Sequence, residues 1–243
     1  GNSLKSYNIS TPFCCILTNT NYLYKTFPTI DGNFQTFIPL ENYQGDTGDN
    51  LISWSYGKLI SEWDALQSEH AERISEKKIL GYATAEGNSE EAADDTTRPI
   101  YEYVIKPYPK NSLGYEEYLS TTPRNIVKVL ICTGVHGNEK SASTGVLFFF
   151  QTMLKSLDDY YLSLSQNCEF HVIPCLNPWG YDNNQRNNAR NVNINRNFGH
   201  NWEYQAGGNV NVKGNSPYSE KETQIVKDWI NNNDMHIYLD VHD

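Results

Sequence analysis

Residues 125–140 read NIVKVLICTGVHGNEK, an apolar run that passes into glycine, histidine and glutamate. Such a run is typical of a strand that is covered on both faces of a parallel sheet. His136 and Glu139 stand three residues apart where this strand is expected to end. Taken alone, an H-x-x-E pattern is also compatible with an ordinary loop. The rest of the sequence has to decide whether the two side chains act together.

Strand and helix patterns alternate on both sides of this stretch. Apolar residues recur with helical spacing in some segments and fill short runs in others. The alternation predicts an α/β fold with three layers (α/β/α) around a doubly wound, mostly parallel mixed sheet. In such sheets the functional site lies beyond the carboxyl ends of the strands. We expect helices at 53–70, 139–157 and 219–230, and strands at 77–84, 98–106, 125–134, 169–178 and 236–243.

Two of these helices carry more detailed expectations. The helix at 219–230 is expected to begin with a capping box, in which the side chains of Ser219 and Glu222 each accept from the other residue's backbone N–H. Helical spacing also predicts which side chains are buried. These are Tyr56, Leu59, Ile60, Trp63 and Leu66 in the first helix, and Ile225, Val226, Trp229 and Ile230 in the last.

The amino-acid composition argues against two classes of protein, those that bind nucleic acid and those that span a membrane. The chain has 243 residues, of which 38% are hydrophobic and 20% charged, as in globular proteins. Its formal net charge of -10 argues against nucleic acid as a partner, because phosphate binding needs clustered Lys and Arg. No apolar run approaches the roughly 20 residues that a membrane span needs. We expect residues 1–50 to form an N-terminal extension of unknown role with short strands, and residues 51–243 to form the α/β domain.

Cysteine usage leaves the compartment open. The five cysteines have no regular spacing, so a disulfide framework is not predicted. Cys132 and Cys175 lie in apolar runs and are expected to be buried thiols. Extracellular and cytoplasmic locations both remain open, because a signal peptide could have preceded Gly1.

One set of potential metal ligands falls at the expected site. His136 and Glu139 follow one strand, and His242 ends another. Two imidazoles and a carboxylate, with one coordination position left open, suit a catalytic zinc ion. The other histidines are expected elsewhere: His70 in solvent, His171 and His236 as structural residues at strand starts, and His200 in a loop that could contact substrate.

A polar loop at 177–198 follows a buried strand. It holds Arg186, Arg190 and Arg196 within eleven residues of an acidic protein. An Asn-rich surface loop without function is one interpretation. Guanidinium groups, however, bind carboxylates in a bidentate manner and stabilise oxyanions. Beside a zinc site, these arginines indicate a substrate that carries a carboxylate.

Five blocks of the sequence resemble the metallocarboxypeptidase family of zinc carboxypeptidases. The likeness runs from about residue 52 to the end, in the family's order, and implies one Zn²⁺ ion and the N-terminal part of a peptidase domain. The blocks are HGNE for H-x-x-E, NPWGY for N-P-D-G-Y, RNNARNVNINRNF for R-x-N-A-R-G-V-D-L-N-R-N-F, SPYSEKET for the S-E-P-E-T segment, and YLDVHD for the strand of the last histidine.

The resemblance implies a role for each matched residue. His136, Glu139 and His242 take the positions of the zinc ligands. Arg186 takes that of the arginine that polarises the scissile carbonyl and holds the oxyanion. The clamp on the substrate's terminal carboxylate falls on Asn195 and Arg196. The expected activity is zinc-dependent hydrolysis of peptide bonds near a free carboxylate.

The sequence departs from the family pattern in three places. Asn193 replaces an aspartate that accepts a hydrogen bond from the first histidine ligand; an amide accepts without charge, which predicts zinc binding about 10–100-fold weaker. Asn191 replaces a glycine, and asparagine tolerates positive φ. The family's general-base glutamate and its closing tyrosine match no position up to Asp243. We therefore expect a fragment of a longer protein, or else a degenerate site that is nearly inactive.

Two other functions stay open at this point. Asn138 gives HGNE, which also occurs in the aspartoacylase and succinylglutamate desuccinylase branch, whose members cleave N-acyl amino acids. A non-catalytic domain that binds peptide C-termini through Arg186, Asn195 and Arg196 is the second. Within the peptidase reading, the R-x-N-A-R spacing resembles bacterial enzymes that trim peptidoglycan peptides. Abundant Asn, Tyr and Ile are typical of an AT-rich bacterial or phage genome.

Overall fold

The computed structural model describes residues 26–28, 34–36, 54–87, 92–108, 126–156 and 158–243. The chain divides into two compact units, Gly1–Ile52 and Ser53–Asp243. In the first unit, β1 (Thr26–Pro28) and β2 (Phe34–Thr36) pair antiparallel. The functional site lies in the second unit.

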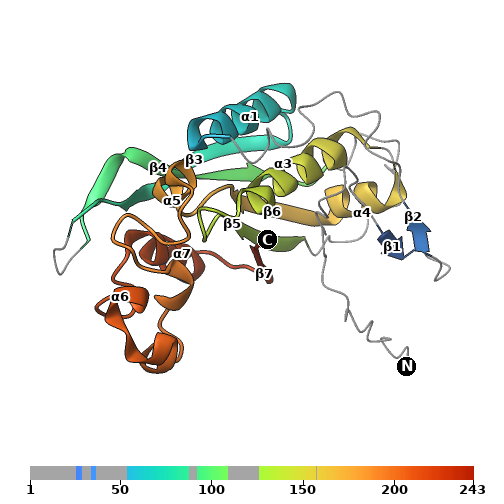
Figure 1. The fold of residues 1–243 in the computed structure, drawn as a ribbon. Coiled ribbons are helices and arrows are strands. Elements are labelled where there is room, and N and C mark those ends of the chain that lie inside the picture. Colours follow the sequence, from blue (N-terminus) through green and yellow to red (C-terminus); the bar gives the residue numbers. More distant parts are fainter. Residues whose placement is uncertain (1–25, 29–33, 37–53, 88–91, 109–125, 157) are drawn as a thin grey trace, which may run out of the picture. The chain divides into compact units, whose positions relative to one another are not determined.

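The second unit is built on a five-stranded sheet in the order β3-β4-β6-β5-β7. β5 pairs parallel with β6 and β7, whereas β4 pairs antiparallel with β3 and β6. The predicted α/β fold with a mixed sheet is therefore confirmed (Figure 1). The strands are β3 (Ile74–Thr84), β4 (Asp94–Ile105), β5 (Val127–Thr133), β6 (Cys168–Ile173) and β7 (Ile237–Val241).

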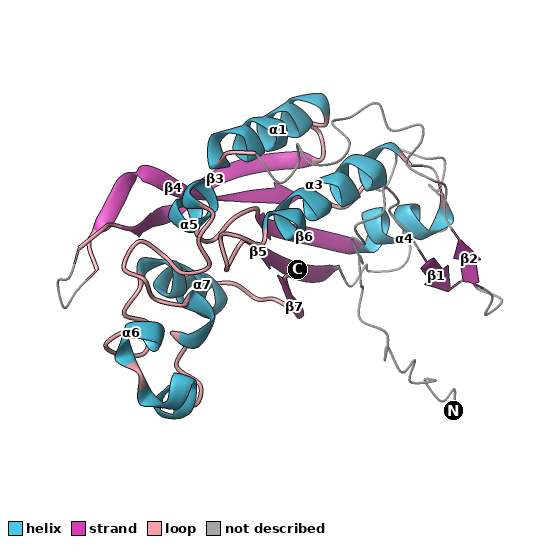
Figure 2. Ribbon diagram, in the orientation of Figure 1, coloured by secondary structure: helices cyan, strands magenta, loops and turns pink. Residues whose placement is uncertain are grey.

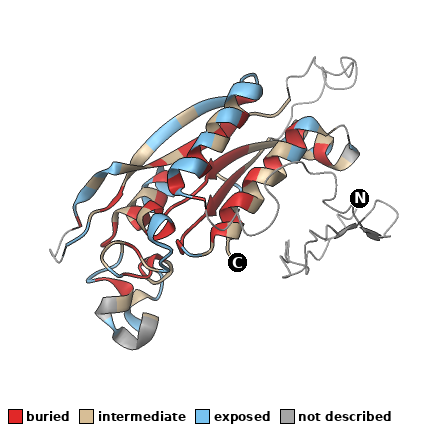
Figure 3. Cartoon of the chain, turned by 45° about the horizontal axis from the view of Figure 1, so that its top comes forward, coloured by how far each residue is buried: buried red, intermediate tan, exposed pale blue. Residues whose placement is uncertain are grey.

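Helices cover both faces of this sheet. Figure 2 shows α1, α3 and α4 on one side of the strands and α7 on the other. The middle strands β5 and β6 are buried along most of their length (Figure 3). The helices are α1 (Tyr56–Glu69), α3 (Lys140–Lys155), α4 (Asp159–Asn167), α5 (Pro178–Asn183), α6 (Val210–Lys213) and α7 (Lys221–Asn232), with short 3-10 turns at Ile194–Arg196 and Trp202–Gly208.

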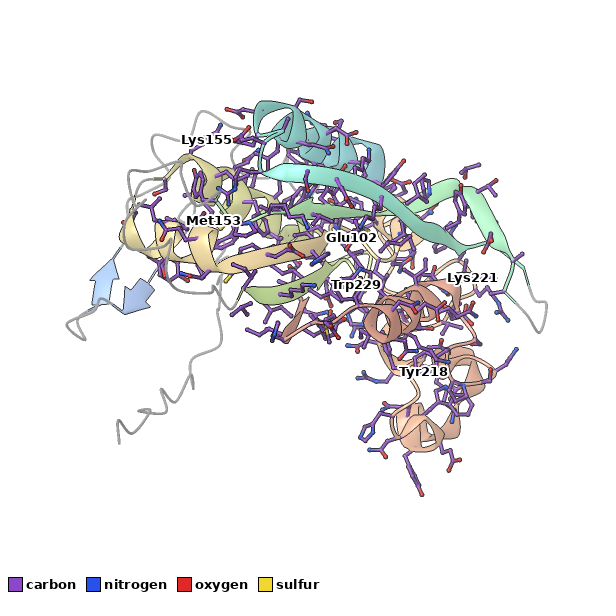
Figure 4. The ribbon with its side chains drawn as sticks, turned by 180° about the vertical axis from the view of Figure 1, so that it is seen from behind. Glu102, Met153, Lys155, Tyr218, Lys221 and Trp229 are labelled. Atoms are coloured by element: carbon purple, nitrogen blue, oxygen red, sulfur yellow. The ribbon has the colours of Figure 1, made fainter. Side chains whose placement is uncertain are left out.

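Alternating side chains on β4 and β6 divide the core into two layers. Tyr103 stacks on Trp63 of α1 with ring centroids 5.1 Å apart, and Phe170 of β6 lies against Phe150 of α3. The neighbouring Glu102 points to the opposite face, as expected for successive residues of a strand. There it accepts a hydrogen bond of 2.8 Å from Trp229 Nε1 of α7; Figure 4 labels both residues.

The first helix follows its sequence pattern closely. Its N-cap is Ser55, whose hydroxyl accepts from the backbone N–H of Lys58 at 3.1 Å. Burial of an apolar face stabilises a helix that propensity alone would leave marginal. The buried residues of α1 are those that the spacing predicted: Tyr56, Leu59, Ile60, Trp63 and Leu66.

The last helix departs from its sequence pattern in two respects. The capping-box prediction is wrong: α7 starts at Lys221 and has no side-chain cap. Ser219 Oγ instead donates to Glu220 Oε1 at 2.7 Å, and Glu222 is fully buried against Thr84 of β3. Ile230 was also placed on the buried face, but it is 36% exposed because Val226 and Trp229 make the contact with the sheet.

Among the described residues, the structure adds three α-helices that the sequence did not indicate. α4 lies before β6, α5 lies in the segment expected to be a loop, and the four-residue α6 precedes α7. Cys132 and Cys175 are buried and unpaired, as predicted. Within the described residues, the helices are all too short or too polar to cross a membrane.

Candidate metal centre

Sheet topology brings the two histidines of the site together. β5 and β7 are parallel neighbours, with Thr133 opposite Val241 at their carboxyl ends. His136 follows the end of β5 and His242 follows the end of β7. Their ring centroids are 4.9 Å apart. The expected position of the site, beyond the carboxyl ends of the strands, is the position observed.

The loop between β5 and α3 places the carboxylate beside the histidines. Gly134 turns the chain with a φ of +63°, a conformation that favours glycine. At Gly137 a Cβ would lie 2.0 Å from the carbonyl carbon of Gly180, so only glycine permits the close approach to α5. Glu139 then takes the N-cap position of α3, and its backbone N–H donates to His136 O at 3.1 Å.

Three side chains converge on one point. Glu139 Oε1 lies 2.8 Å from His136 Nδ1, and Glu139 Oε2 lies 2.7 Å from His242 Nδ1. One potential ligand atom from each residue falls within 4.8 Å of the other two, and no other such group of three exists among the described residues. Two imidazole nitrogens and a carboxylate oxygen at this spacing could hold a metal ion.

Burial and neighbouring charges shift the pKa values of Glu139 and His242. His136 is 2% exposed. Burial raises the pKa of Glu139, but hydrogen bonds with His242 and His136 outweigh it and hold that pKa below its ordinary value. The carboxylates of Asp240 and Glu139 raise the pKa of His242 to about 9 against the opposing effect of burial. The three side chains therefore form one hydrogen-bonded cluster centred on the Glu139 carboxylate.

The outward nitrogen of each histidine faces an oxygen. His136 Nε2 lies 3.1 Å from Asn193 Oδ1, which also accepts from the backbone N–H of Asn195 at 3.0 Å. His242 Nε2 lies 3.0 Å from Asp240 Oδ2. Asn193 is thus placed where the sequence argument put it, behind the first histidine. Asp240 was not anticipated, although its spacing of two residues from His242 on a strand is a signal that could have identified it.

Arg186 stands at the rim of the cluster. Its Nη1 donates to Glu139 Oε1 at 2.9 Å, while about half of the side chain (49%) remains exposed. The guanidinium therefore reaches the cluster and solvent at once. A cavity of about 150 Å³ adjoins it, lined by Trp179, Gln185, Arg186, Asn187, Asn188, Ala189 and Asn191.

Asn195 and Arg196 follow Asn193 in a short 3-10 turn. Both are half-buried. Arg196 donates to the carbonyl of Asn195 at 3.0 Å and forms no ion pair with a described residue. Asn191, before this turn, has a φ of +61°, a left-handed conformation that asparagine tolerates.

The structure also places the remaining arginine of the polar loop and the other four histidines. Arg190 pairs with the buried Glu220 at 3.2 Å, so grouping it with substrate-facing arginines is corrected. His171 contacts Glu102 and Glu169, and His236 accepts from the backbone of Lys128, as structural histidines would. His70 was expected in solvent, but only 14% of its side chain is exposed. His200 is exposed and contacts Asn201.

The family model of zinc carboxypeptidases matches residues 59–243. The chain belongs to this family. The resemblance inferred from the five sequence blocks is thereby confirmed at the level of the family. No curated protein matches the chain significantly.

Solved structures of carboxypeptidases share the fold. Carboxypeptidase A from Helicoverpa armigera superposes with a TM-score of 0.57 at 19% identity, over 87% of this chain and 55% of that one. Bovine thrombin-activatable fibrinolysis inhibitor, in complex with tick carboxypeptidase inhibitor, gives 0.56 at 20%, over 78% and 60%. A metallo-carboxypeptidase from Burkholderia cenocepacia gives 0.50 at 20%, over 78% and 41%. The chain thus spans between about two fifths and three fifths of the length of these proteins.

Proposed function

We propose that this chain carries the metal site of a zinc-dependent carboxypeptidase that hydrolyses peptide bonds next to a free carboxylate. The convergence of His136, Glu139 and His242 on one point, with Arg186 at its rim, is the observation that supports this most directly. The family supports it independently. Because the chain spans only part of its relatives' length, the hydrolysis is proposed for the full-length gene product.

The proposed ligands are His136, Glu139 and His242, which would hold one Zn²⁺ ion. When bound, zinc lowers the pKa of a coordinated water to about 7 and so supplies a nucleophile at neutral pH. The burial of His136, its hydrogen bond with Asn193 and the Asp240 carboxylate 3.0 Å from His242 Nε2 would keep the ligands oriented. A preoriented ligand set costs little rearrangement when the metal enters.

Arg186 is proposed to bind the oxygen of the scissile carbonyl as negative charge develops on it. Its guanidinium is half exposed and already lies 2.9 Å from Glu139, so a carbonyl beside the ligand set would be within its reach. Donors aimed at such an oxyanion typically contribute about 10²–10³ in turnover.

Asn195 and Arg196 are proposed to bind the terminal carboxylate of the substrate. The support is their position in the turn that begins at Asn193, next to His136, and the absence of an ion pair between Arg196 and any described residue. The substrate class is therefore a peptide with a free C-terminus. Peptidoglycan peptides, which carry such carboxylates, are proposed as a specific case on the basis of the R-x-N-A-R spacing.

Hydrolysis of matched peptides with free and amidated C-termini tests this function. We expect the full-length product to contain zinc and to cleave only the free-carboxylate series, synthetic peptidoglycan peptides included. Arg186→Ala should lower turnover about 10²–10³-fold while zinc content stays at the wild-type level. Arg98→Ala, which removes an equal charge from an ion pair on β4, is the control.

Four outcomes would contradict parts of the proposal. Equal cleavage of amidated peptides would contradict the proposed binding of the terminal carboxylate by Asn195 and Arg196. Loss of zinc in Arg186→Ala would show that this residue holds the metal site together rather than acting on substrate. Cleavage of N-acyl amino acids in place of peptides would point to the deacylase branch, and peptide binding without cleavage would point to a binding domain.

A further inference from the structure

The two histidines of the cluster differ in the group that lies next to Nε2, the ring nitrogen that points away from Glu139. Each ring turns Nδ1 toward Glu139 and Nε2 away from it. Behind His136, Nε2 meets the side-chain amide oxygen of Asn193, which carries no net charge. Behind His242, Nε2 meets the carboxylate of Asp240 at 3.0 Å.

Strand geometry explains why Asp240 reaches His242. Residues two apart on a strand project from the same face, and Asp240 lies on β7 two positions before His242. The contact is at ion-pair distance, although its angle falls outside that of a regular hydrogen bond. His242 Nε2 is buried and forms no hydrogen bond with any other described group. Asp240 is therefore the group placed to accept a hydrogen bond from Nε2–H.

We propose that Asp240 is a positioning residue for the metal site. Its carboxylate places a negative charge next to the ligand His242, whereas the neutral amide of Asn193 places none next to the ligand His136. This inference rests on the proposed metal site. A carboxylate that accepts a hydrogen bond from Nε2–H fixes the tautomer with Nδ1 free to bind, holds the ring in place and makes Nδ1 a stronger electron-pair donor to a metal. Metal affinity should accordingly depend on Asp240 more than on Asn193.

Zinc affinity, measured by competition with a chromophoric chelator at fixed pH, tests the proposal. Asp240→Asn should weaken binding about 10–100-fold. Asn193→Asp, which places a carboxylate behind His136, should strengthen it, and combining the two substitutions should restore much of the loss. Asp234→Asn removes the same charge from an exposed residue in the turn before β7 and should leave affinity unchanged.

A second readout separates positioning from general stability. ¹⁵N shifts of His242 in the metal-free protein report which ring nitrogen carries a proton. We expect Asp240→Asn to change these shifts while leaving those of His171, on β6, unaltered. Asp240→Glu, which keeps the charge, should recover most of the wild-type zinc affinity.

The outcomes also separate this inference from the metal site itself. If Asp240→Asn and Asp234→Asn bind zinc as the wild type does, while His136→Ala does not bind it, the role of Asp240 is overturned and the metal site stands. If His136→Ala and His242→Ala also bind zinc normally, the proposed metal site is wrong, and the role of Asp240, which rests on it, is wrong as well.

Discussion

Glu222 is a carboxylate in an unusual environment for a charged group. It has no exposure to solvent, and it accepts hydrogen bonds from the backbone N–H of Thr84 at 3.0 Å and from its hydroxyl at 2.6 Å. Burial raises the pKa of Glu222 above its ordinary value of 4.5, and the two bonds from Thr84 offset only part of this. The nearby Glu220 carboxylate raises it further.

Glu222→Gln should change the pH dependence of stability in a definite direction. Because Glu222 binds its proton more tightly in the folded state, folding gains stability as the pH falls from the raised pKa toward 4.5. Across this window the unfolding free energy of the wild type should rise relative to that of Glu222→Gln, by at most about 1.4 kcal/mol per pH unit. Urea unfolding of both proteins at a series of pH values measures this difference.

Glu169 provides a control of opposite sign. Burial raises the pKa of Glu169, but hydrogen bonds with Lys106 and His171 outweigh it, and the net pKa is lowered. A carboxylate with a lowered pKa contributes stability that is lost as the pH falls through that pKa. Relative to Glu169→Gln, the wild type should therefore lose stability on acidification. Parallel curves for the wild type and either variant would show that the carboxylate concerned does not titrate differently on folding.

Single residues could be predicted from the sequence where their conformation depends on neighbours within a few residues of the chain. The asparagine at position 191, where the family has glycine, was expected to be tolerated, and its φ is +61°. The capping box at Ser219 and Glu222 failed because Glu222 bonds to Thr84, which lies 138 residues away in the chain. The pairing of Arg190 with Glu220, 30 residues on, escaped sequence analysis for the same reason. A pattern within five residues carries no information about such partners.

Helices and strands could be predicted from the sequence where buried apolar residues recur at a regular spacing. The apolar spacing of α1 gave its buried face because that face packs on a sheet. α5 has six residues, too few for a helical period, and its signals are local: Asn177 as N-cap accepting from Gly180 N–H, and Pro178 in the first turn. The segment therefore resembled a loop in sequence. The ligand positions of the site, by contrast, depend on parallel strands whose carboxyl ends meet at one edge of the sheet, which the alternation of elements indicated.

The close approach of the β5–α3 loop to α5 gives a test at this scale. Gly137→Ala would place a Cβ 2.0 Å from the carbonyl carbon of Gly180 and 2.3 Å from the backbone nitrogen of Tyr181. Neither backbone atom can move without shifting α5. We expect a loss of about 1–3 kcal/mol in unfolding free energy, as for overpacked cores. Zinc affinity should fall as well, because His136 precedes the strained residue; calorimetry and chelator competition measure the two effects.

Gly145→Ala is the matched control. Gly145 lies inside α3, and apart from the backbone of its own helix and its chain neighbours no described atom comes within 4 Å of the position that its Cβ would take. Alanine in a helix interior is favoured over glycine by about 0.5–1 kcal/mol, so this variant should be slightly more stable and should bind zinc normally. If Gly137→Ala behaved like Gly145→Ala, the close approach between the loop and α5 would not constrain the site.

Across the whole second unit, the cluster joins parts of the chain that are far apart in sequence. His136 and Glu139 belong to the β5–α3 connection, whereas His242 follows β7, which pairs only with β5 among the described strands. β7 is less buried than its neighbours: Ile237 is 44% and Leu239 43% exposed. A metal ion bound by all three residues would therefore link the least covered strand to the centre of the sheet.

Zinc should consequently stabilise the fold and should act most strongly on β7. A ligand that binds only the folded state at a free concentration of 100 times its Kd adds about 2.7 kcal/mol to the unfolding free energy. In hydrogen exchange, the amides of Ile237–Val241 should gain more protection than those of Cys168–Ile173, which are buried in the sheet already. A chelator should reverse both changes, and His242→Ala should abolish them. Equal gains in the two strands would mean that the metal stabilises the domain without tying down β7, and no gain in either would argue against the ligand set.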